Sequence, residues 1–424
     1  MPALSRQPAG MAWAAAASAA APALRLMLRR RAARGREIPA RLAERFGIDA
    51  SVRPSGRLLW LHAASVGEAV SALPVLSALP EGITTLFTTG TVTSARLLAA
   101  RLPELGLGGR VLHRFVPLDV PGWVARFLDH WRPDAACFLE SEIWPNMLEA
   151  CRRRDIPAAL INARLSARSA ARWARAPGFA RHLLGGFAFV AAQSDADAER
   201  LGGLGAAAES VGNLKFAAPA LPADEAAVAE LRARLGDRPR WLAASTHPAD
   251  DAVIAAAHQA LAARHPGLLT AIVPRHPERG AALAAMFGAA RRSQGADPPQ
   301  GGVWIGDTMG ELGLLYRCFP IVLMGKSFGA GGGQNPWEPA MLGCAVACGP
   351  AMQNFEDAVG RLRDSGALEV VADAAGVVAW VSRMLGDRAA LAAVSSAGLA
   401  ATSANLELPS LLATRLAALT TRHG

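Results

Sequence analysis

The sequence predicts an α/β protein made of two doubly wound halves, each with a mostly parallel sheet. Short apolar runs alternate with longer helical stretches from about residue 57, and this βαβα order is typical of parallel sheets covered by helices on both faces. The alternation restarts after a Pro/Ala-rich segment at 218–226. A chain of 424 residues is long enough for two domains, each with a core of its own.

The first half contains four apolar runs that we expect to form buried strands. Each of the first three is followed by a small-residue turn and then a helix. In chain order the strands and helices are RLLWLHA and SVGEAVSALPVLSAL, GITTLFTT and GTVTSARLLAARL, PDAACFLE and SEIWPNMLEACRRR, and the strand IPAALINA. Ligands of doubly wound sheets bind beyond the carboxyl ends of the strands, so we expect the functional residues in these turns.

The second half repeats the pattern after the boundary segment. Its expected strands, again separated by helical stretches, are RWLAAST, GLLTAIVP, GGVWIGD, FPIVLMG and CAVACG. We place the linker near 215–225. With two such halves, the expected ligand site is a cleft that both of them face.

The basic character of the chain is concentrated near its N-terminus. The net charge is +9, and residues 25–45 hold eight Arg and two Glu, which leaves six of the nine charges there. An Ala-rich apolar run at 11–28 precedes this cluster. A membrane anchor or an interfacial helix on anionic lipid fits both features; a signal peptide and a disordered basic leader are the alternatives.

The remaining composition excludes some classes of function. The positive charge is local and no basic strand is interleaved with aromatic residues, which disfavours nucleic-acid binding. The five Cys show no C-x-x-C spacing and indicate reduced, buried thiols. We see no zinc pattern among the nine His. The acidic triplet at 195–197 resembles a metal motif of sugar transferases, but helix capping by Ser194 and Asp195 explains it better.

Lysine is rare in this chain. Of the 44 basic residues only Lys215 and Lys326 are Lys. Arg and Lys are nearly interchangeable on a solvated surface, but not where a compact ammonium must meet a developing charge. The segment VGNLKFA, which contains Lys215, is therefore a candidate for a functional position, with chance as the alternative.

Three predicted strand-to-helix junctions share one spacing. A cap residue is followed three positions later by Glu in Ser65–Glu68, Thr308–Glu311 and Asn335–Glu338. The spacing is typical of the capping box, so capping alone explains any one junction. The alternative is a ligand site, because Gly67 and Gly310 allow close approach to the backbone and helix starts suit phosphate. A carboxylate there can also serve as a base.

Charged residues also follow other predicted strands. Arg275 comes directly after one strand and is either a solvated loop residue or a phosphate clamp. Glu140 and Glu142 follow another. We expect only one of these two carboxylates to face the site.

Taken together, these motifs resemble one family, the 3-deoxy-D-manno-octulosonic acid (Kdo) transferases of lipopolysaccharide synthesis. The resemblance runs from about residue 40 to about residue 390. The matching segments, in order, are HAASVGEA, ESEIWPN, NARLSARS, VGNLKF, ASTHP, VPRHPER, GDTMGEL, GGGQNPWEPA and GPAMQNF.

The resemblance implies a GT-B fold with two Rossmann-like domains facing a central cleft. It implies an anchor or basic leader at 1–35, a domain at 36–217 that binds the lipid A precursor, and a domain at 218–424 that binds CMP-Kdo. The C-terminal helix is expected to return to the first domain. The implied reaction is inverting and metal-independent, with no cofactor beyond the donor substrate. It takes place at the cytoplasmic face of the inner membrane, beside anionic lipid.

The resemblance also implies roles for individual residues. Glu68 matches the general base that takes a proton from the acceptor hydroxyl. Glu140 and Lys215 match positions that stabilise the transition state. The segments that match the CMP-binding positions are Pro274 and Arg275; Met309, Gly310 and Glu311; and Asn335, Pro336, Trp337 and Glu338. The physical chemistry agrees, since a carboxylate offsets an oxocarbenium-like charge and cations receive the leaving phosphate.

The chain departs from the family pattern at several positions. Lys326 stands in MGKS where a second Gly is expected, and Trp337 and Ala217 replace an aliphatic residue and an Asp. A role for Lys326 at the CMP phosphate or the Kdo carboxylate stays open beside chance. Two other functions are kept as alternatives: a different GT-B nucleotide-sugar enzyme, and a membrane-surface scaffold without catalysis.

Overall fold

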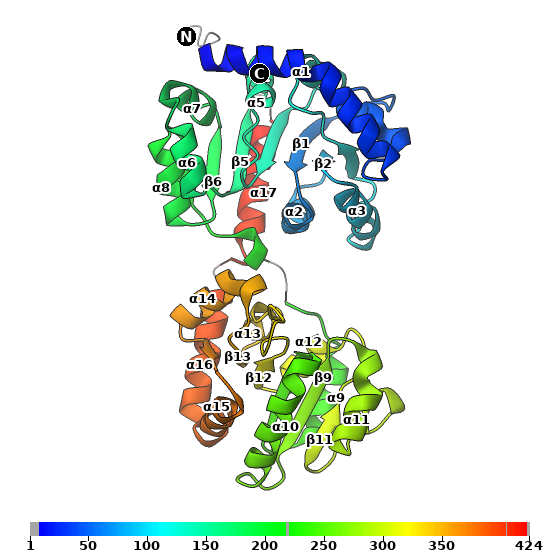
Figure 1. Cartoon of the computed structure of the whole chain (residues 1–424), viewed down its shortest axis with the longest axis vertical. Coiled ribbons are helices and arrows are strands. Elements are labelled where there is room, and N and C mark those ends of the chain that lie inside the picture. Colours follow the sequence, from blue (N-terminus) through cyan, green and yellow to red (C-terminus); the bar gives the residue numbers. More distant parts are fainter. Residues whose placement is uncertain (1–7, 218–219, 404, 422–424) are drawn as a thin grey trace. The chain divides into compact units, whose positions relative to one another are not determined.

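The chain forms two compact units, each built around one parallel sheet. Figure 1 shows the computed structural model, which describes residues 8–217, 220–403 and 405–421. The first unit comprises Met1–Ala218 and Asn405–Gly424, and the second comprises Pro219–Ala404. Residues 1–7 of the expected leader and the first two residues of the expected boundary segment at 218–226 lie outside the described residues.

The sheet of the first unit has seven parallel strands in the order β3-β2-β1-β4-β5-β6-β7. Its strands are β1 Arg57–Ala63, β2 Ile83–Thr89, β3 Val111–Phe115, β4 Ala135–Leu139, β5 Ala158–Ala163, β6 Phe189–Ala192 and β7 Ala208–Ser210. Its helices are α1 Pro8–Ala33, α2 Val66–Ala78, α3 Val92–Glu104, α4 Pro121–Trp131, α5 Pro145–Arg152, α6 Ala167–Trp173, α7 Pro177–Leu184, α8 Asp195–Gly203 and α17 Leu408–Leu419, with 3₁₀ turns η1 Pro39–Phe46 and η2 Leu214–Phe216.

The strands of the first unit are buried on both faces. In β1, Leu59 and Leu61 belong to a core that α2, α3 and α17 complete, while Leu58 and Trp60 belong to a second core beneath α4, α5 and α7. This is why the predicted strands are continuous apolar runs instead of alternating ones. Helix α17 comes from the far end of the sequence, and it lies among the elements of the first unit in Figure 1.

The second unit has the same plan, with strand order β10-β11-β9-β8-β12-β13-β14. Its strands are β8 Arg240–Thr246, β9 Leu269–Pro274, β10 Ala290–Arg291, β11 Gly302–Ile305, β12 Ile321–Met324, β13 Ala345–Cys348 and β14 Leu368–Val370. Its helices are α9 Glu225–Leu235, α10 Pro248–Ala262, α11 Gly280–Phe287, α12 Leu312–Cys318, α13 Trp337–Met341, α14 Glu356–Asp364, α15 Ala374–Gly386 and α16 Arg388–Ser403, with 3₁₀ turns η3 Pro277–Arg279, η4 Arg292–Gln294 and η5 Gln353–Phe355. Two doubly wound parallel sheets confirm the predicted fold class.

Helix α1, the blue helix in Figure 1, packs on α4 and α5 of the first unit through a few contacts. Trp13 donates a hydrogen bond from its indole nitrogen to Asp119 at 2.9 Å, and Leu28 is buried beside Val120 and Trp123. The rest of the helix is largely exposed. By length and composition alone, α1 is apolar enough to cross a membrane.

Candidate active site

The first group of candidate residues lies where the strand order of the first sheet reverses. Strands β1 and β4 are neighbours, and the chain winds away from them in opposite directions. Glu68 follows β1 in the first turn of α2, and Glu140 directly follows β4. Such a switch point leaves a crevice beyond the strand ends, where doubly wound sheets bind their ligands.

Glu68 is a buried carboxylate with a raised pKa. The Ser65 hydroxyl accepts the backbone N–H of Glu68 at 3.2 Å, as the capping interpretation predicts, and the Glu68 carboxylate accepts the N–H of Ala64 at 2.8 Å. Burial raises the pKa of Glu68, the negative charges of Glu142 and Glu140 raise it further, and hydrogen bonding of its carboxyl to the Ala64 N–H and the Ser65 side chain opposes this only in part. A carboxylate with a raised pKa is a stronger base. The Glu68 side chain can therefore bind the helix start and also act as a base.

Glu140 and Lys215 form an ion pair, with 3.4 Å between Lys215 Nζ and Glu140 Oε1. The loop that carries Lys215 is held by amide side chains. Asn213 accepts the N–H of Lys215, and Asn162 accepts the N–H of Leu214, each at 2.9 Å. These bonds place the ammonium against the carboxylate that follows β4. The structure therefore brings Glu68, Glu140 and Lys215 to one edge of one sheet.

Both acidic residues after β4 lie in a turn at the end of the strand. The backbone is not extended there, because Glu140 has a φ of 50° and the N–H of Glu142 binds the carbonyl of Leu139 at 3.1 Å. Glu140 pairs with Lys215 and Glu142 with His62, and the negative charges of both contribute to the raised pKa of Glu68.

His62 is a residue near the site to which the sequence analysis gave no role. It is buried in β1, and its Nε2 lies 3.2 Å from the Glu142 carboxylate, which also accepts the indole N–H of Trp144. Burial would raise the pKa of Glu142, but the hydrogen bonds from His62 and Trp144 lower it below its usual value. The only sequence signal was a histidine inside an otherwise apolar strand.

A cavity of about 260 Å³ adjoins this cluster within the first unit. His62, Ala64, Glu142 and Trp144 line one side, and Ala64 is the residue whose N–H binds Glu68. The other side is formed by the end of α1 and by the strand ends, with Met27, Leu28, Arg31, Glu37, Arg45, Gly90, Val116, Pro117, Leu118, Asp119 and Met147. The wall thus combines apolar side chains, such as Met27 and Leu28, with charged ones, such as Arg31 and Arg45.

The second group of candidate residues lies at the carboxyl edge of the second sheet. Pro274 ends β9 and Arg275 follows it; Met309, Gly310 and Glu311 lie between β11 and α12; Asn335 and Pro336 precede α13, which begins with Trp337 and Glu338. All three segments follow parallel strands, which is why they lie along one edge. Gly310 has a φ of 79°, a conformation that favours glycine.

Glu311 does not form the predicted capping box. It occupies the N-cap position of α12 without a side-chain cap bond. Its carboxylate accepts hydrogen bonds from Nε and Nη2 of Arg292, each at 2.6 Å, and a further one from the Thr308 hydroxyl. The Arg292 hydrogen bonds hold the pKa of Glu311 below its usual range. A bidentate Arg–carboxylate pair fixes the orientation of Glu311. Arg292 is thus a second residue that the sequence did not single out.

The third junction is built around Asn335. Its side chain accepts the N–H of Trp337 at 3.1 Å and donates to Glu338 at 3.2 Å. Pro336 precedes the helix instead of opening it. Burial raises the pKa of Glu338, while Asn335 and the positive charge of Arg275 oppose the rise. This electrostatic contact links Arg275, which is exposed, to the Asn335–Glu338 segment.

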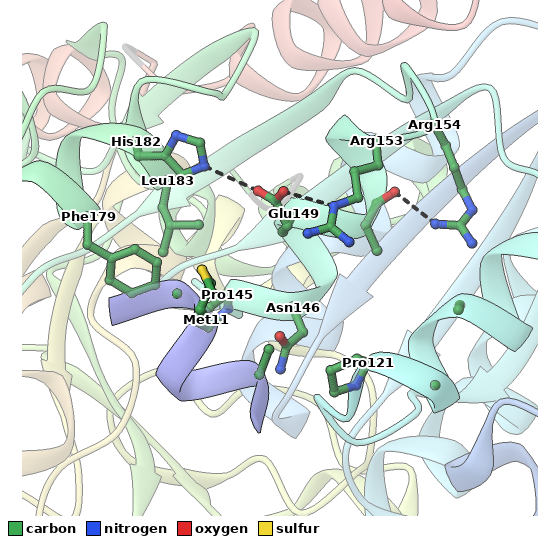
Figure 2. A pocket seen from close by; sticks show the side chains of 15 residues that line it. Met11, Pro121, Pro145, Asn146, Glu149, Arg153, Arg154, Phe179, His182 and Leu183 are labelled. Atoms are coloured by element: carbon green, nitrogen blue, oxygen red, sulfur yellow. Dashed lines mark hydrogen bonds and ion pairs between the residues drawn. The ribbon is translucent and has the colours of Figure 1, made fainter. Parts of the chain in front are cut away.

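Figure 2 shows another cavity of the first unit, of about 580 Å³, between α1, α4, α5 and α7. Glu149 binds His182 at 3.2 Å and Arg153 at 3.0 Å along its wall, and Arg154 lies beside them. Met11 of α1 lines the same space. None of the predicted site residues lines it, so it is separate from the carboxylate cluster after β1 and β4.

The structure also bears on other predictions from composition. All five Cys are free and buried, as predicted. Ser194 caps α8 by accepting the N–H of Asp197, which confirms the capping interpretation of the acidic triplet. Within the described ranges, no three His, Cys, Asp or Glu side chains are grouped in a way that could hold a metal ion.

Comparison with known proteins identifies the family of this chain. Residues 40–218 match the family described as 3-Deoxy-D-manno-octulosonic-acid transferase (kdotransferase). The chain is also 35% identical over 369 residues to a probable mitochondrial 3-deoxy-D-manno-octulosonic acid transferase of Arabidopsis thaliana, covering 82% of this chain and 81% of that protein. The chain belongs to the Kdo transferase family.

Bacterial members of the Kdo transferase family match over a similar span. The 3-deoxy-D-manno-octulosonic acid transferase of Haemophilus influenzae is 34% identical over 373 residues, covering 84% of this chain and 86% of its own. That of Bordetella pertussis is 35% identical over 364 residues, covering 83% and 85%. The predicted family is thus confirmed, and the chain is a glycosyltransferase.

Solved structures show the same fold at lower identity. A glycosyltransferase from Rickettsia africae has a TM-score of 0.52 at 13% identity, covering 88% of this chain and all of that one. MurG from Acinetobacter baumannii has a TM-score of 0.51 at 14% identity, covering 83% and 99%. These likenesses establish the GT-B architecture of this Kdo transferase family member.

Proposed function

We propose that this protein transfers Kdo from CMP-Kdo to a lipid A precursor, lipid IVA, with inversion and without a metal ion. The observation that carries the proposal is the buried Glu68 carboxylate at the switch point of the first sheet, together with membership of the Kdo transferase family. Glu68, with its raised pKa and its place beyond the end of β1, has the properties of a general base.

In this mechanism the acceptor hydroxyl attacks the anomeric carbon of Kdo. Its proton passes to the Glu68 carboxylate as the new C–O bond forms, and the bond from the anomeric carbon to the phosphate oxygen breaks, releasing CMP. Attack on the face opposite the leaving group inverts the configuration. Residue Glu140 offsets the positive charge of the oxocarbenium-like centre, and Lys215, bound to Glu140 at 3.4 Å, supplies positive charge for the leaving phosphate.

We assign acceptor binding to the first unit. The cavity of about 260 Å³ that adjoins Glu68 through Ala64 is lined by the apolar side chains of Met27 and Leu28 and by the guanidinium groups of Arg31, also in α1, and Arg45. Apolar and cationic surfaces side by side suit a lipid that carries phosphate groups. Arg31 and Arg45 both pair with Glu37, at 3.1 Å, which fixes their positions.

We assign CMP binding to the carboxyl edge of the second sheet. Glu311 is oriented by Arg292, Asn335 orients Glu338, and Arg275 stands beside that carboxylate. Carboxylates of this kind accept hydrogen bonds from ribose hydroxyls or from the cytosine amino group, and Arg275 can pair with the phosphate. These cations and the helix starts carry the charge compensation in a reaction without a metal.

We also propose that the first unit lies on the cytoplasmic face of the inner membrane through α1. The exposed arginines of α1 and of the turn that follows it are Arg25, Arg29, Arg30, Arg34 and Arg36. Three apolar residues of α1 are also exposed, namely Met11, Leu26 and Met27. Such a surface suits anionic lipid. The cavity of Figure 2, with Met11, Arg153 and Arg154 around it, adds a further place for an anionic headgroup.

The test is Kdo transfer from CMP-Kdo to lipid IVA by the full chain, with wild type compared with Glu68→Gln. Glutamine can still bind the N–H of Ala64, so circular dichroism should show an unchanged fold. We expect turnover to fall by about 10²–10⁴-fold. Full activity of Glu68→Gln would reduce Glu68 to a cap, and a wild type that binds lipid but transfers nothing would favour the scaffold alternative.

A further inference from the structure

The second of the two lysines, Lys326, occupies the switch point of the second sheet. Strands β8 and β12 are neighbours there, and the strand order runs away from them on both sides. Lys326 follows β12 by two residues and His247 directly follows β8. The N–H of Gly325 binds the carbonyl of Ala244 at 2.7 Å, which holds the two strand ends together.

Lys326 has a backbone conformation that favours glycine. Its φ is 57°, in the left-handed region that residues with a side chain rarely adopt. The conformation is held by Asp250, which accepts the backbone N–H of Lys326 at 2.6 Å and that of Phe328 at 3.2 Å. Glycine would fit this position without strain. A strained non-glycine residue beside a ligand crevice points to a role for its side chain.

The Lys326 ammonium is not used to stabilise the fold. Among the residues that the structure describes, its Nζ has no hydrogen-bond or ion-pair partner. Asp250 binds backbone N–H groups, including that of His247 at 2.8 Å, and the Oδ2 atom of Asp251 pairs with Arg279 at 2.5 Å. The ammonium therefore keeps its positive charge available at the strand ends.

Lys326 lies against the residues to which we assign the donor. The glycine-rich loop that leads to Asn335 folds onto it, since the N–H of Gly333 binds the Lys326 carbonyl at 2.8 Å and a Cβ on Gly331 would lie 2.6 Å from Lys326 Cγ. A glycine at 331 thus makes room for the lysine stem. His247 lies 3.5 Å from Gln334 of the same loop.

The surroundings of Lys326 are rich in groups that bind anions. The rings of His247 and His276 are 5.5 Å apart, and the backbone N–H of Arg275 binds the Thr246 carbonyl at 3.1 Å beside them. Burial lowers the pKa of His247, and the positive charge of Lys326 lowers it further. Cationic and imidazole donors beyond the ends of parallel strands form a site for an oxyanion.

We propose that Lys326 binds an oxyanion of the donor, either the carboxylate of its sugar or the phosphate of its nucleotide, with His247 as the neighbouring donor. This inference rests on the proposed function, because it takes CMP-Kdo as the donor. It makes Lys326 a specificity-determining residue of this chain, at a position where glycine is the expected residue.

The test uses the full chain and three ligands, cytidine, CMP and CMP-Kdo, with wild type compared with Lys326→Gly. Losing a charge-assisted hydrogen bond costs about tenfold or more in affinity. If the phosphate is the partner, the Kd for CMP rises by that factor while the Kd for cytidine stays unchanged. If the carboxylate is the partner, only the KM for CMP-Kdo rises. Both results support the proposal, and Lys326→Arg should recover part of the loss.

Stability measurements separate binding from structure. Glycine relieves the left-handed strain, so Lys326→Gly should keep or raise the Tm. A lower Tm with weaker binding of all three ligands, cytidine included, would make Lys326 structural and overturn the proposal. Arg383→Gln, which removes one exposed charge from α15 of the same unit, is the matched control and should change none of these values.

Two negative outcomes remain distinguishable. If wild type transfers Kdo and Lys326→Gly has the same constants for CMP and CMP-Kdo, the inference is wrong while the proposed function stands. If wild type binds neither CMP nor CMP-Kdo, the proposed function is wrong and the inference is rejected with it.

Discussion

The ammonium of Lys215 lies 3.4 Å from the carboxylate of Glu140, and the two side chains come from loops that are 75 residues apart in sequence. Lys215 is 44% exposed, so the pair adds about 1 kcal/mol or less to the free energy of unfolding. We expect the pair to contribute to catalysis instead of stability. Lys215→Met should lower kcat by about 10²-fold, with a Tm near that of wild type.

A double-mutant cycle tests whether the two residues act together. If they do, Lys215→Met combined with Glu140→Gln should cost less than the product of the two single effects on kcat. Independent, multiplicative effects would show that the ion pair is not a functional unit. Lys215→Arg should recover little, because a guanidinium is wider than an ammonium and cannot occupy the same place.

The raised pKa of Glu68 predicts the acid limb of the pH profile. A carboxyl with a raised pKa stays protonated to higher pH, and a protonated Glu68 cannot act as a base. The kcat/KM should therefore fall as pH drops through a pKa above 4.5, the ordinary value for glutamate. Glu81→Gln, at an exposed position of the same unit, should leave the profile unchanged. An acid limb at or below 4.5 would contradict the assignment.

Arg292 is expected to position Glu311 for the donor. Arg292→Lys keeps the charge but loses the two-pronged bond, so the KM for CMP-Kdo should rise by about tenfold while the KM for the acceptor is unchanged. Arg234→Gln removes a neighbouring exposed arginine that pairs with Glu230, and it should have no effect on either constant. Equal rises in both KM values would indicate general damage to the second unit.

The exposed arginines at the end of α1 predict binding to anionic lipid. Replacing Arg29, Arg30 and Arg34 by Gln should weaken binding to vesicles that contain phosphatidylglycerol by about tenfold or more, with little change for neutral vesicles. The charge-matched control replaces the exposed residues Arg168, Arg172 and Arg175. Cosedimentation measures both. Equal losses in the two triple variants would refute a specific role for α1.

Helix α17 is expected to stabilise the first unit. Leu412 is fully buried in the core that also contains Leu59 and Leu61. Leu412→Ala should lower the free energy of unfolding by about 2–5 kcal/mol, because it leaves a cavity in a close-packed core. Thermal unfolding checks this. Leu411→Ala, at an exposed position of the same helix, should cause little change.

Much of the fold could be predicted from the sequence because buried parallel strands leave a strong signal. The runs RLLWLHA and RWLAAST became β1 and β8 with the predicted bounds. Caps were predictable where one residue decides them: Ser65 and Ser194 both accept the expected backbone N–H. The same spacing misled at Thr308–Glu311, because Glu311 is bound by Arg292, a residue 19 positions away that no local pattern reveals.

The carboxylate cluster shows where sequence reasoning fails. Strand alternation could not decide whether one or both of Glu140 and Glu142 face the site, because the left-handed conformation of Glu140 ends the strand there. His62 was missed since its partner, Glu142, lies 80 residues away and is brought near only by the pairing of β1 with β4. Contacts across a sheet depend on strand order, which the alternation of apolar runs does not specify.

Because α17 belongs to the first unit, the first unit can complete its core only after the second unit has been synthesised. A ribosome releases the sequence from the N-terminus, so residues 219–404 are available as one uninterrupted piece before 405–424 are made. The second unit can then mature while the first still lacks Leu412 and Leu416 in its core. Until residues 405–424 are made, the first unit lacks the part of its core that α17 supplies. A chain truncated before residue 405 would lack it permanently and should be a target for chaperones and proteases.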